Sequence, residues 1–306
     1  MRPAFSVILF TVLAGMGQGL FLMLVRADAL GADPHELAVG GFASVALLGA
    51  GLACSFFHLG HPMRAWRAIA MWRTSWLSRE VIVLPLTIAV VALWSLEHLL
   101  GKPHTAALAA AGVVLCLALW WCTGMIYACL RFLREWAHPL TLLNFALLGW
   151  MSGATLFAAY WSVLHGAAAA RLWVVAAMVL TCAGAAARLA SLARNRALRP
   201  KSTPQSAIGV AAARVRQISQ GTTGGSFNTR EFFHGRSAAF VANVKSIALV
   251  LAFALPLVLL AAAWVWPVPG LLPAAAAAQF VGLIAERWLF FAQANHPQNI
   301  YYQAVA

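Results

Sequence analysis

Two titratable side chains stand at the ends of a polar segment that separates two long apolar runs. His58 ends the first run and Glu80 begins the next. Histidine has a pKa near neutrality, and burial can raise the pKa of a glutamate into the same range. A quinone that changes oxidation state in a membrane exchanges protons with water, which requires such groups at the lipid–water boundary. We therefore predict that His58 and Glu80 exchange protons with a quinone.

The same residues also have a purely structural interpretation. A histidine at a helix C-terminus and a glutamate in a first turn both complement the helix dipole. Ser78 would then be the N-cap of the helix that contains Glu80. From the residues alone, both interpretations stay open.

Aromatic residues accompany these groups. Trp66, Trp72 and Trp76 lie in the same polar segment and would form an apolar wall for a quinone head group. Tryptophan is also common at any membrane interface, so this pattern does not by itself define a site.

A charged pair, Glu286 and Arg287, lies inside the last apolar run. Charges within a membrane span are costly and usually face the interior of the helix bundle. One interpretation is an internal ion pair that locks two helices together. The other is a part of a proton path or of the head-group pocket.

Several kinds of site have no candidate residues. A haem held between helices needs histidines deep in the bundle, but all nine histidines lie near predicted helix ends or in loops. The five cysteines form no CxxC pair, and no GxxxxGK[ST] motif is present. The sequence therefore predicts no haem or metal in this chain and no ATPase, and electrons would have to come from a partner.

The composition defines the solvent of the chain. Of its 306 residues, 62% are hydrophobic and 9% are charged, whereas soluble domains are about 25% charged. Most of the chain must therefore lie in lipid. The net charge of +13 is spread between apolar runs, so we expect no nucleic-acid partner.

The apolar runs predict an all-α fold, a polytopic membrane bundle of eight transmembrane helices within a single membrane domain, residues 1–306. A span needs about 20 mostly apolar residues. The first run has no A-x-A cleavage site, so we interpret it as a retained helix rather than a signal peptide. The predicted spans are 4–26, 36–57, 80–100, 105–130, 140–164, 171–193, 239–263 and 268–291.

Basic residues predict the orientation. Eighteen of the 21 lysines and arginines fall on the side of the N-terminus, and three (Arg26, Lys102 and Arg171) fall on the other. Because positively charged loops stay in the cytoplasm, both termini and the long loop 194–238 should be cytoplasmic, in the inner membrane of a bacterium.

Two motifs resemble a known family. Residues 58–65 (HLGHPMRA), followed by 77–80 (LSRE), resemble the pattern H-L-G-x-P-x-R-A and then L-S-x-E of the dimethyl sulfoxide reductase anchor subunits. The resemblance implies a haem-free membrane anchor that exchanges electrons with quinone (ubiquinone or menaquinone). It also implies a molybdopterin catalytic subunit and an iron–sulfur subunit as partners. The family's quinol-site histidine and glutamate correspond to His58 and Glu80, and Arg64 and Arg287 are further carried-over residues.

One departure from that family selects among its relatives. Dimethyl sulfoxide reductases commonly work on the periplasmic face, whereas the charge distribution here places His58 on the cytoplasmic side. The chain is in this respect similar to the anchors of cytoplasmic sulfite-oxidising complexes. The loop segment 221–233 also departs from the reductase anchors. We therefore expect sulfite oxidation with quinone reduction, and an iron–sulfur subunit docked on loops 59–79 and 194–238.

Two alternatives remain. The first is a quinol-oxidising anchor of a sulfoxide-type reductase, in which electrons run the other way. The second is a small-solute transporter, which would place polar groups near the midplane of the membrane. Few mid-helix residues are polar here, Gln18, Asn144 and Ser152 among them.

Overall fold

The computed structural model describes residues 1–102, 104–200, 202–219 and 227–301. These residues form helices and no strand, and eight helices are long and apolar enough to cross a membrane. The eight predicted spans are confirmed, and the largest boundary difference is at Trp76, four residues before the predicted start at 80. Their bounds are Phe5–Asp28 (α1), Pro34–Phe56 (α2), Trp76–Leu99 (α3), Thr105–Ala128 (α4), Pro139–His165 (α5), Arg171–Arg196 (α6), Ala238–Val265 (α9, η2 and α10 in succession) and Leu271–Ala292 (α11).

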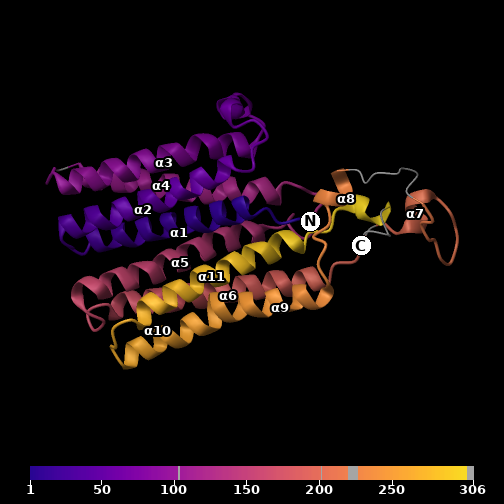
Figure 1. Cartoon of the computed structure of the whole chain (residues 1–306). Coiled ribbons are helices and arrows are strands. Elements are labelled where there is room, and N and C mark those ends of the chain that lie inside the picture. The colour runs from indigo at the N-terminus through magenta and orange to yellow at the C-terminus, as the bar shows by residue number, and fades with distance from the viewer. Residues whose placement is uncertain (103, 201, 220–226, 302–306) are drawn as a thin grey trace.

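The spans pack as one bundle with α1 and α5 at its centre. Helices α2, α3 and α4 lie on one side, and α6, α9, α10 and α11 lie on the other (Figure 1). Helices α1, α5 and α11 are the most buried spans, whereas most of the surface of α2, α3, α4 and α9–α10 faces outward. These outer helices therefore present their apolar side chains to lipid.

Close contact between α1 and α5 depends on glycine. A Cβ atom added at Gly153 would lie 2.1 Å from the carbonyl carbon of Gly19, and one added at Gly19 would lie 2.3 Å from the carbonyl oxygen of Gly149. In lipid, such small residues let helix backbones approach closely enough for van der Waals contact. The two central helices are therefore held together by backbone-to-backbone packing.

The seventh span contains a short π-helical turn, η2 (Val250–Ala254), between α9 (Ala238–Leu249) and α10 (Leu255–Val265). Pro256 has no N–H, so the carbonyl of Ala252 loses its usual donor one turn later. The buried side chain of Gln279 on α11 replaces it, donating from Nε2 to the Ala252 oxygen at 3.2 Å and to Thr181 Oγ1 at 3.3 Å. This contact ties the irregular turn to both neighbouring helices.

Short elements gather at one end of the bundle. Residues 1–4, 204–219, 227–237 and 293–301 form what we call the terminal lobe, which contains α7 (Pro204–Ile208), α8 (Phe227–Glu231) and η3 (Pro297–Tyr301) (Figure 1). The Arg2 amide donates to the Glu231 carbonyl at 2.9 Å, and the N-terminal amine donates to the Ala294 carbonyl at 2.9 Å. The start of the chain and the end of α11 therefore lie at the same end of the bundle.

A separate element, η1 (Pro62–Met71), connects α2 to α3 at this same end. It stands beside the end of α3, away from α7 and α8 (Figure 1). None of its residues is buried.

Candidate functional site

Glu80 is positioned by the first turns of α3. Ser75 has extended backbone and accepts a hydrogen bond from the Ser78 amide at 3.3 Å, so Ser75 is the N-cap and the helix begins at Trp76. The prediction that Ser78 is the cap was wrong, because Ser75 ends the connecting turn three residues earlier. Glu80 consequently lies one turn deeper in the helix than expected.

The carboxyl group of Glu80 is enclosed by protein. Only 4% of the residue is exposed, and the hydroxyl of Thr123 on α4 is hydrogen-bonded to Glu80 Oε1. A carboxyl group near a membrane surface that is withdrawn from water in this way can hold and release a proton. The role of Glu80 in exchanging protons with a quinone stays a prediction.

The other residues predicted around Glu80 lie in the exposed connection to α3. His58 follows the end of α2, and Arg64 and Trp66 belong to η1; all three are exposed, Trp66 by 68%. Although the His58 side chain is exposed, neighbouring protein atoms displace part of its hydration and lower its pKa below the ordinary value. Among the described residues, no hydrogen bond or ion pair joins His58 to Glu80. The two residues share one end of the bundle but are not bonded to each other.

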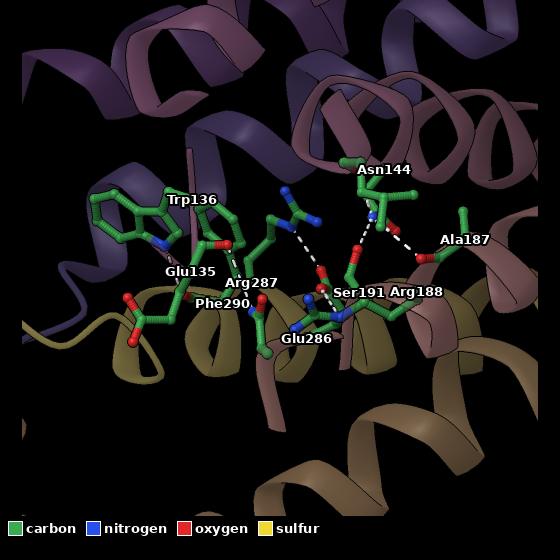
Figure 2. Close-up of polar contacts among 11 residues, drawn as sticks. Glu135, Trp136, Asn144, Ala187, Arg188, Ser191, Glu286, Arg287 and Phe290 are labelled. Atoms are coloured by element: carbon green, nitrogen blue, oxygen red, sulfur yellow. Dashed lines mark hydrogen bonds and ion pairs between the residues drawn. The ribbon is translucent and has the colours of Figure 1, made fainter. Parts of the chain in front are cut away.

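A second group of charges lies inside the bundle, as Figure 2 shows. Glu286 on α11 forms an ion pair with Arg188 on α6, with Nε and Oε1 2.7 Å apart, and its Oε2 accepts a hydrogen bond from Arg287 Nε at 2.6 Å. All three residues are at most 3% exposed. The interpretation of Glu286 and Arg287 as an internal ion pair is confirmed, and Arg188 is the partner that links α11 to α6.

Aromatic rings enclose the guanidinium of Arg287. Its Cζ atom lies 4.4 Å from the centre of the Phe145 ring and 5.1 Å from that of Phe290. Such cation–π contacts partly compensate for the loss of hydration. A cavity of about 20 Å³ lies beside Arg287 and is also lined by Thr11 and Ser152. It has room for one water molecule between polar groups.

A polar group on the other side of Arg188 leads toward the terminal lobe. Asn144 Nδ2 donates to Ser191 Oγ at 2.7 Å and contacts the Ala187 carbonyl at 3.4 Å (Figure 2). A cavity of about 10 Å³ is lined by Asn144, Arg188 and Gln293, among others. The buried charges are thus flanked by small polar spaces rather than by apolar packing alone.

Tyr127 lies near both groups. It is on α4, one turn beyond Thr123, and its ring stacks on that of Phe145, which also adjoins Arg287. Its ring is surrounded by Trp136, Phe145, Phe290 and Phe291 at 5.2–5.5 Å between ring centres. One aromatic cluster therefore adjoins Arg287 and begins one turn of α4 from the hydrogen-bond partner of Glu80.

The structure changes the interpretation of two basic residues. Arg188 and Arg287 contributed to the count of eighteen cytoplasmic charges, but both are buried in the ion cluster. Removing them from the eighteen leaves sixteen basic residues against three, so the asymmetry persists. The lone charge of Arg188 in an apolar run was a signal that could have identified the cluster. Thr123 gave no comparable signal.

Within the described parts of the chain, no group of three or more His, Cys, Asp or Glu side chains is arranged to hold a metal ion. The five cysteines are free, and Cys129 and Cys182 are exposed.

These features define a class of protein: a multi-pass membrane subunit whose longest polar segments gather at one end of the bundle. The family described as DMSO reductase anchor subunit (DmsC) matches residues 1–292, and the chain belongs to this family. The chain is also 49% identical to a sulfite dehydrogenase subunit of Allochromatium vinosum, over an alignment of 326 residues that covers 100% of both chains. The family predicted from residues 58–65 and 77–80 is confirmed.

Proposed function

We propose that this chain is the membrane anchor and quinone-reactive subunit of a molybdopterin and iron–sulfur oxidoreductase complex. In this proposal, electrons from the oxidation of sulfite in the cytoplasm reach the quinone pool through the complex. Membership of the anchor-subunit family supports the role of anchor, and the full-length similarity to a sulfite dehydrogenase subunit supports the substrate. The same membership speaks against the solute-transporter alternative.

The observation that carries the quinone role is the buried carboxyl group of Glu80. It lies at the end of the bundle that bears His58, and Thr123 is its hydrogen-bond partner. Reduction of a quinone to a quinol takes two electrons and two protons. In our proposal Glu80 holds one proton within the bundle, and exposed His58 exchanges protons with water. His58, Arg64, Trp66, Glu80 and Arg287 are the residues that we assign to the quinone and its protons.

Arg287 has a different role from the other four residues that we assign to the quinone. Its guanidinium lies against Phe145 and Phe290 and is paired with Glu286, so we assign it an electrostatic role rather than direct contact with the head group. Its buried positive charge would favour negative charge on that side of the bundle.

The terminal lobe is our proposed docking surface for the iron–sulfur subunit. It contains residues 204–219 and 227–237 of loop 194–238, which include four arginines, together with residues 1–4 and 293–301. Residues 221–226 of the segment 221–233 lie outside the described residues. The segment 59–79, which we expected to share in docking, lies beside α3 and away from this lobe (Figure 1). The catalytic molybdopterin subunit would bind through the iron–sulfur subunit.

The orientation is part of the proposal. Of the basic residues that the structure describes outside the ion cluster, fifteen lie at the end with His58 and the terminal lobe, against three at the opposite end. Positively charged segments stay in the cytoplasm, so this end would face the cytoplasm of a bacterium across its inner membrane.

The family match favours a second candidate, a quinol-oxidising anchor of a sulfoxide-type reductase. The two candidates differ in the direction of electron flow. The purified complex should reduce a quinone analogue with sulfite under the first proposal. Activity only with reduced quinol and a sulfoxide would establish the second.

The quinone site itself is tested by Glu80→Gln and His58→Arg. Each should lower sulfite-to-quinone turnover at least about a hundredfold, since positioned proton donors contribute about 10²–10⁴ to rates. Sulfite oxidation with a soluble dye, which bypasses the anchor, should persist. Glu97→Gln, at the other end of α3, is the matched control and should retain quinone turnover. Full quinone activity in both site variants would contradict the proposal.

A further inference from the structure

The connection between α2 and α3 combines basic and aromatic side chains. Residues 57–79, which we call the Arg–Trp segment, contain four arginines and three tryptophans, and no aspartate or glutamate. Nothing in the quinone proposal requires this many cations and aromatic rings together. The segment therefore needs an explanation of its own.

Large apolar side chains of the segment are strongly exposed. Phe57 is 84% exposed, Met63 is 90% exposed and Trp72 is 51% exposed. Exposed apolar groups of this size next to cations are typical of helices that lie in the membrane interface, with apolar side chains at the acyl boundary and cations at the head groups.

The arginines divide into two kinds. Arg79 folds back onto the segment, donating to the carbonyls of Trp72 and Arg73 at 2.9 Å each, with its guanidinium 4.0 Å from the centre of the Trp76 ring. Arg64, Arg67 and Arg73 are exposed, and none of their guanidinium groups has a hydrogen-bond acceptor among the described residues. Arg79 thus holds the segment in place, and the other three are available to a ligand.

Two of the available arginines are held over indole rings. The Arg67 guanidinium carbon lies 5.5 Å from the Trp66 ring centre, and that of Arg73 lies 5.4 Å from the Trp72 ring centre. Stacking leaves the edge of a guanidinium open, and this edge fits two oxygens of a phosphate. Indole rings favour the head-group level of a bilayer.

The location of the segment points to lipid rather than to a protein partner. It links two membrane-spanning helices, so both of its ends are fixed at the bilayer boundary. It also stands to the side of the bundle, away from the terminal lobe (Figure 1). A partner seated on that lobe would leave the Arg–Trp segment facing the surrounding head groups.

We propose that the Arg–Trp segment is a binding site for anionic phospholipid, in which Arg67 and Arg73 bind the phosphate groups. Phe57 and Met63 enter the acyl boundary beside them. Lipid binding of this kind does not depend on quinone chemistry, so it can be tested separately from the proposed function.

The test places an environment-sensitive nitrobenzoxadiazole dye on Met63→Cys, in a chain that also carries Cys129→Ser and Cys182→Ser. The complex is reconstituted into vesicles of phosphatidylcholine with rising fractions of phosphatidylglycerol. We expect the dye emission to shift to the blue as phosphatidylglycerol is added. Arg67→Gln with Arg73→Gln should raise the fraction needed for half of the shift at least about fivefold, because each basic residue at an anionic surface adds substantially to the attraction.

Two control pairs make the result specific. Arg67→Lys with Arg73→Lys keeps the charge and should keep most of the shift. Arg196→Gln with Arg199→Gln removes the same charge from exposed positions elsewhere at this end and should leave the shift unchanged. Equal emission in both lipids, or equal loss in the Arg196 and Arg199 pair, would overturn the proposal. So would a shift that appears only when the iron–sulfur subunit is added, because the occupant would then be a protein.

Discussion

At the scale of single residues, Glu286 has the most unusual surroundings. Its carboxylate forms ion pairs with Arg188 and Arg287 inside the bundle, and the cluster carries one net positive charge. Burying three ionised groups is costly unless each keeps a partner. Glu286 is the only member that contacts both of the others, so the stability of the cluster depends on it.

We expect Glu286→Gln to destabilise the protein by about 3–5 kcal/mol, because two buried guanidinium groups would lose their counter-charge. Arg188→Gln should cost less, since the pair of Glu286 and Arg287 at 2.6 Å remains. Thermal unfolding of the purified complex in mild detergent measures both. An equal or larger loss in Arg188→Gln would show that Glu286 is not the centre of the cluster.

His58 leads to a prediction about pH. Partial burial lowers its pKa below the ordinary value of 6.5, so the neutral ring is favoured. The protonated form is therefore present only at lower pH and becomes scarce as the pH rises through this lowered pKa. Where proton delivery limits turnover, quinone reduction should fall with rising pH, with a midpoint below 6.5.

The pH profile of sulfite-to-quinone turnover tests this expectation. His58→Asn has no titrating ring, so it should lower turnover. The decrease in turnover with a midpoint below pH 6.5 should also disappear from its pH profile. Dye-linked turnover of the same samples separates this effect from titration in the catalytic subunit. A fall that persists unchanged in His58→Asn would assign the titration to another group.

At the scale of elements, the contact between α1 and α5 determines how the centre of the bundle is built. Gly15 and Gly19 face Gly149 and Gly153, and backbone atoms meet where side chains would otherwise stand. The spacing of four residues on both helices is the small-xxx-small pattern of membrane helix pairs. This pattern was present in the sequence, and we did not use it to predict the pairing.

Gly153→Ala should therefore destabilise the bundle by about 1–3 kcal/mol, the usual cost of overpacking a core. The added Cβ atom would meet the backbone of α1 at 2.1 Å, and backbone cannot move aside cheaply. Gly49→Ala on α2 is the matched control, because its Cβ would meet no atom within 4 Å. Melting temperatures in detergent compare the two variants, and equal values would contradict the packing argument.

At the scale of the whole molecule, the polar groups divide the bundle into two unlike ends. The end with His58 bears the terminal lobe, the Arg–Trp segment and most of the basic residues. At the opposite end, His98 and Asp28 join α3 to α1 at 3.3 Å, and His165 and Glu36 join α5 to α2 at 2.9 Å. The connections between helices at this end are short, so less polar surface is available there for a partner protein to bind.

The orientation of the molecule can be measured directly. Ala168→Cys marks the short loop at the opposite end, and Ala212→Cys marks the terminal lobe; both positions are exposed. In a Cys129→Ser and Cys182→Ser background, a membrane-impermeant thiol reagent added to intact bacterial cells should label position 168 and not 212. Permeabilised cells should label both. The reverse pattern would place the proposed docking surface outside the cytoplasm.

The sequence by itself determined the solvent of this protein and the number of its spans. Each apolar run from residue 4 to residue 291 became a helix, because the chain in lipid must satisfy its backbone hydrogen bonds within each span. The family could be predicted from residues 58–65 and 77–80, because a motif of consecutive residues can be recognised without knowing the fold. Glu80 and the pair of Glu286 and Arg287 were also visible, because ionisable residues are rare in such runs.

The contacts of those residues depend on how the helices pack. The bond between Glu80 and Thr123 joins residues 43 positions apart, and Arg188 meets Glu286 across two helices. The side chains of α4 and α6 are mostly apolar on every face. A periodic pattern in the sequence therefore does not indicate which face of either helix packs inward. Helix packing makes that choice through glycine contacts and the few buried charges.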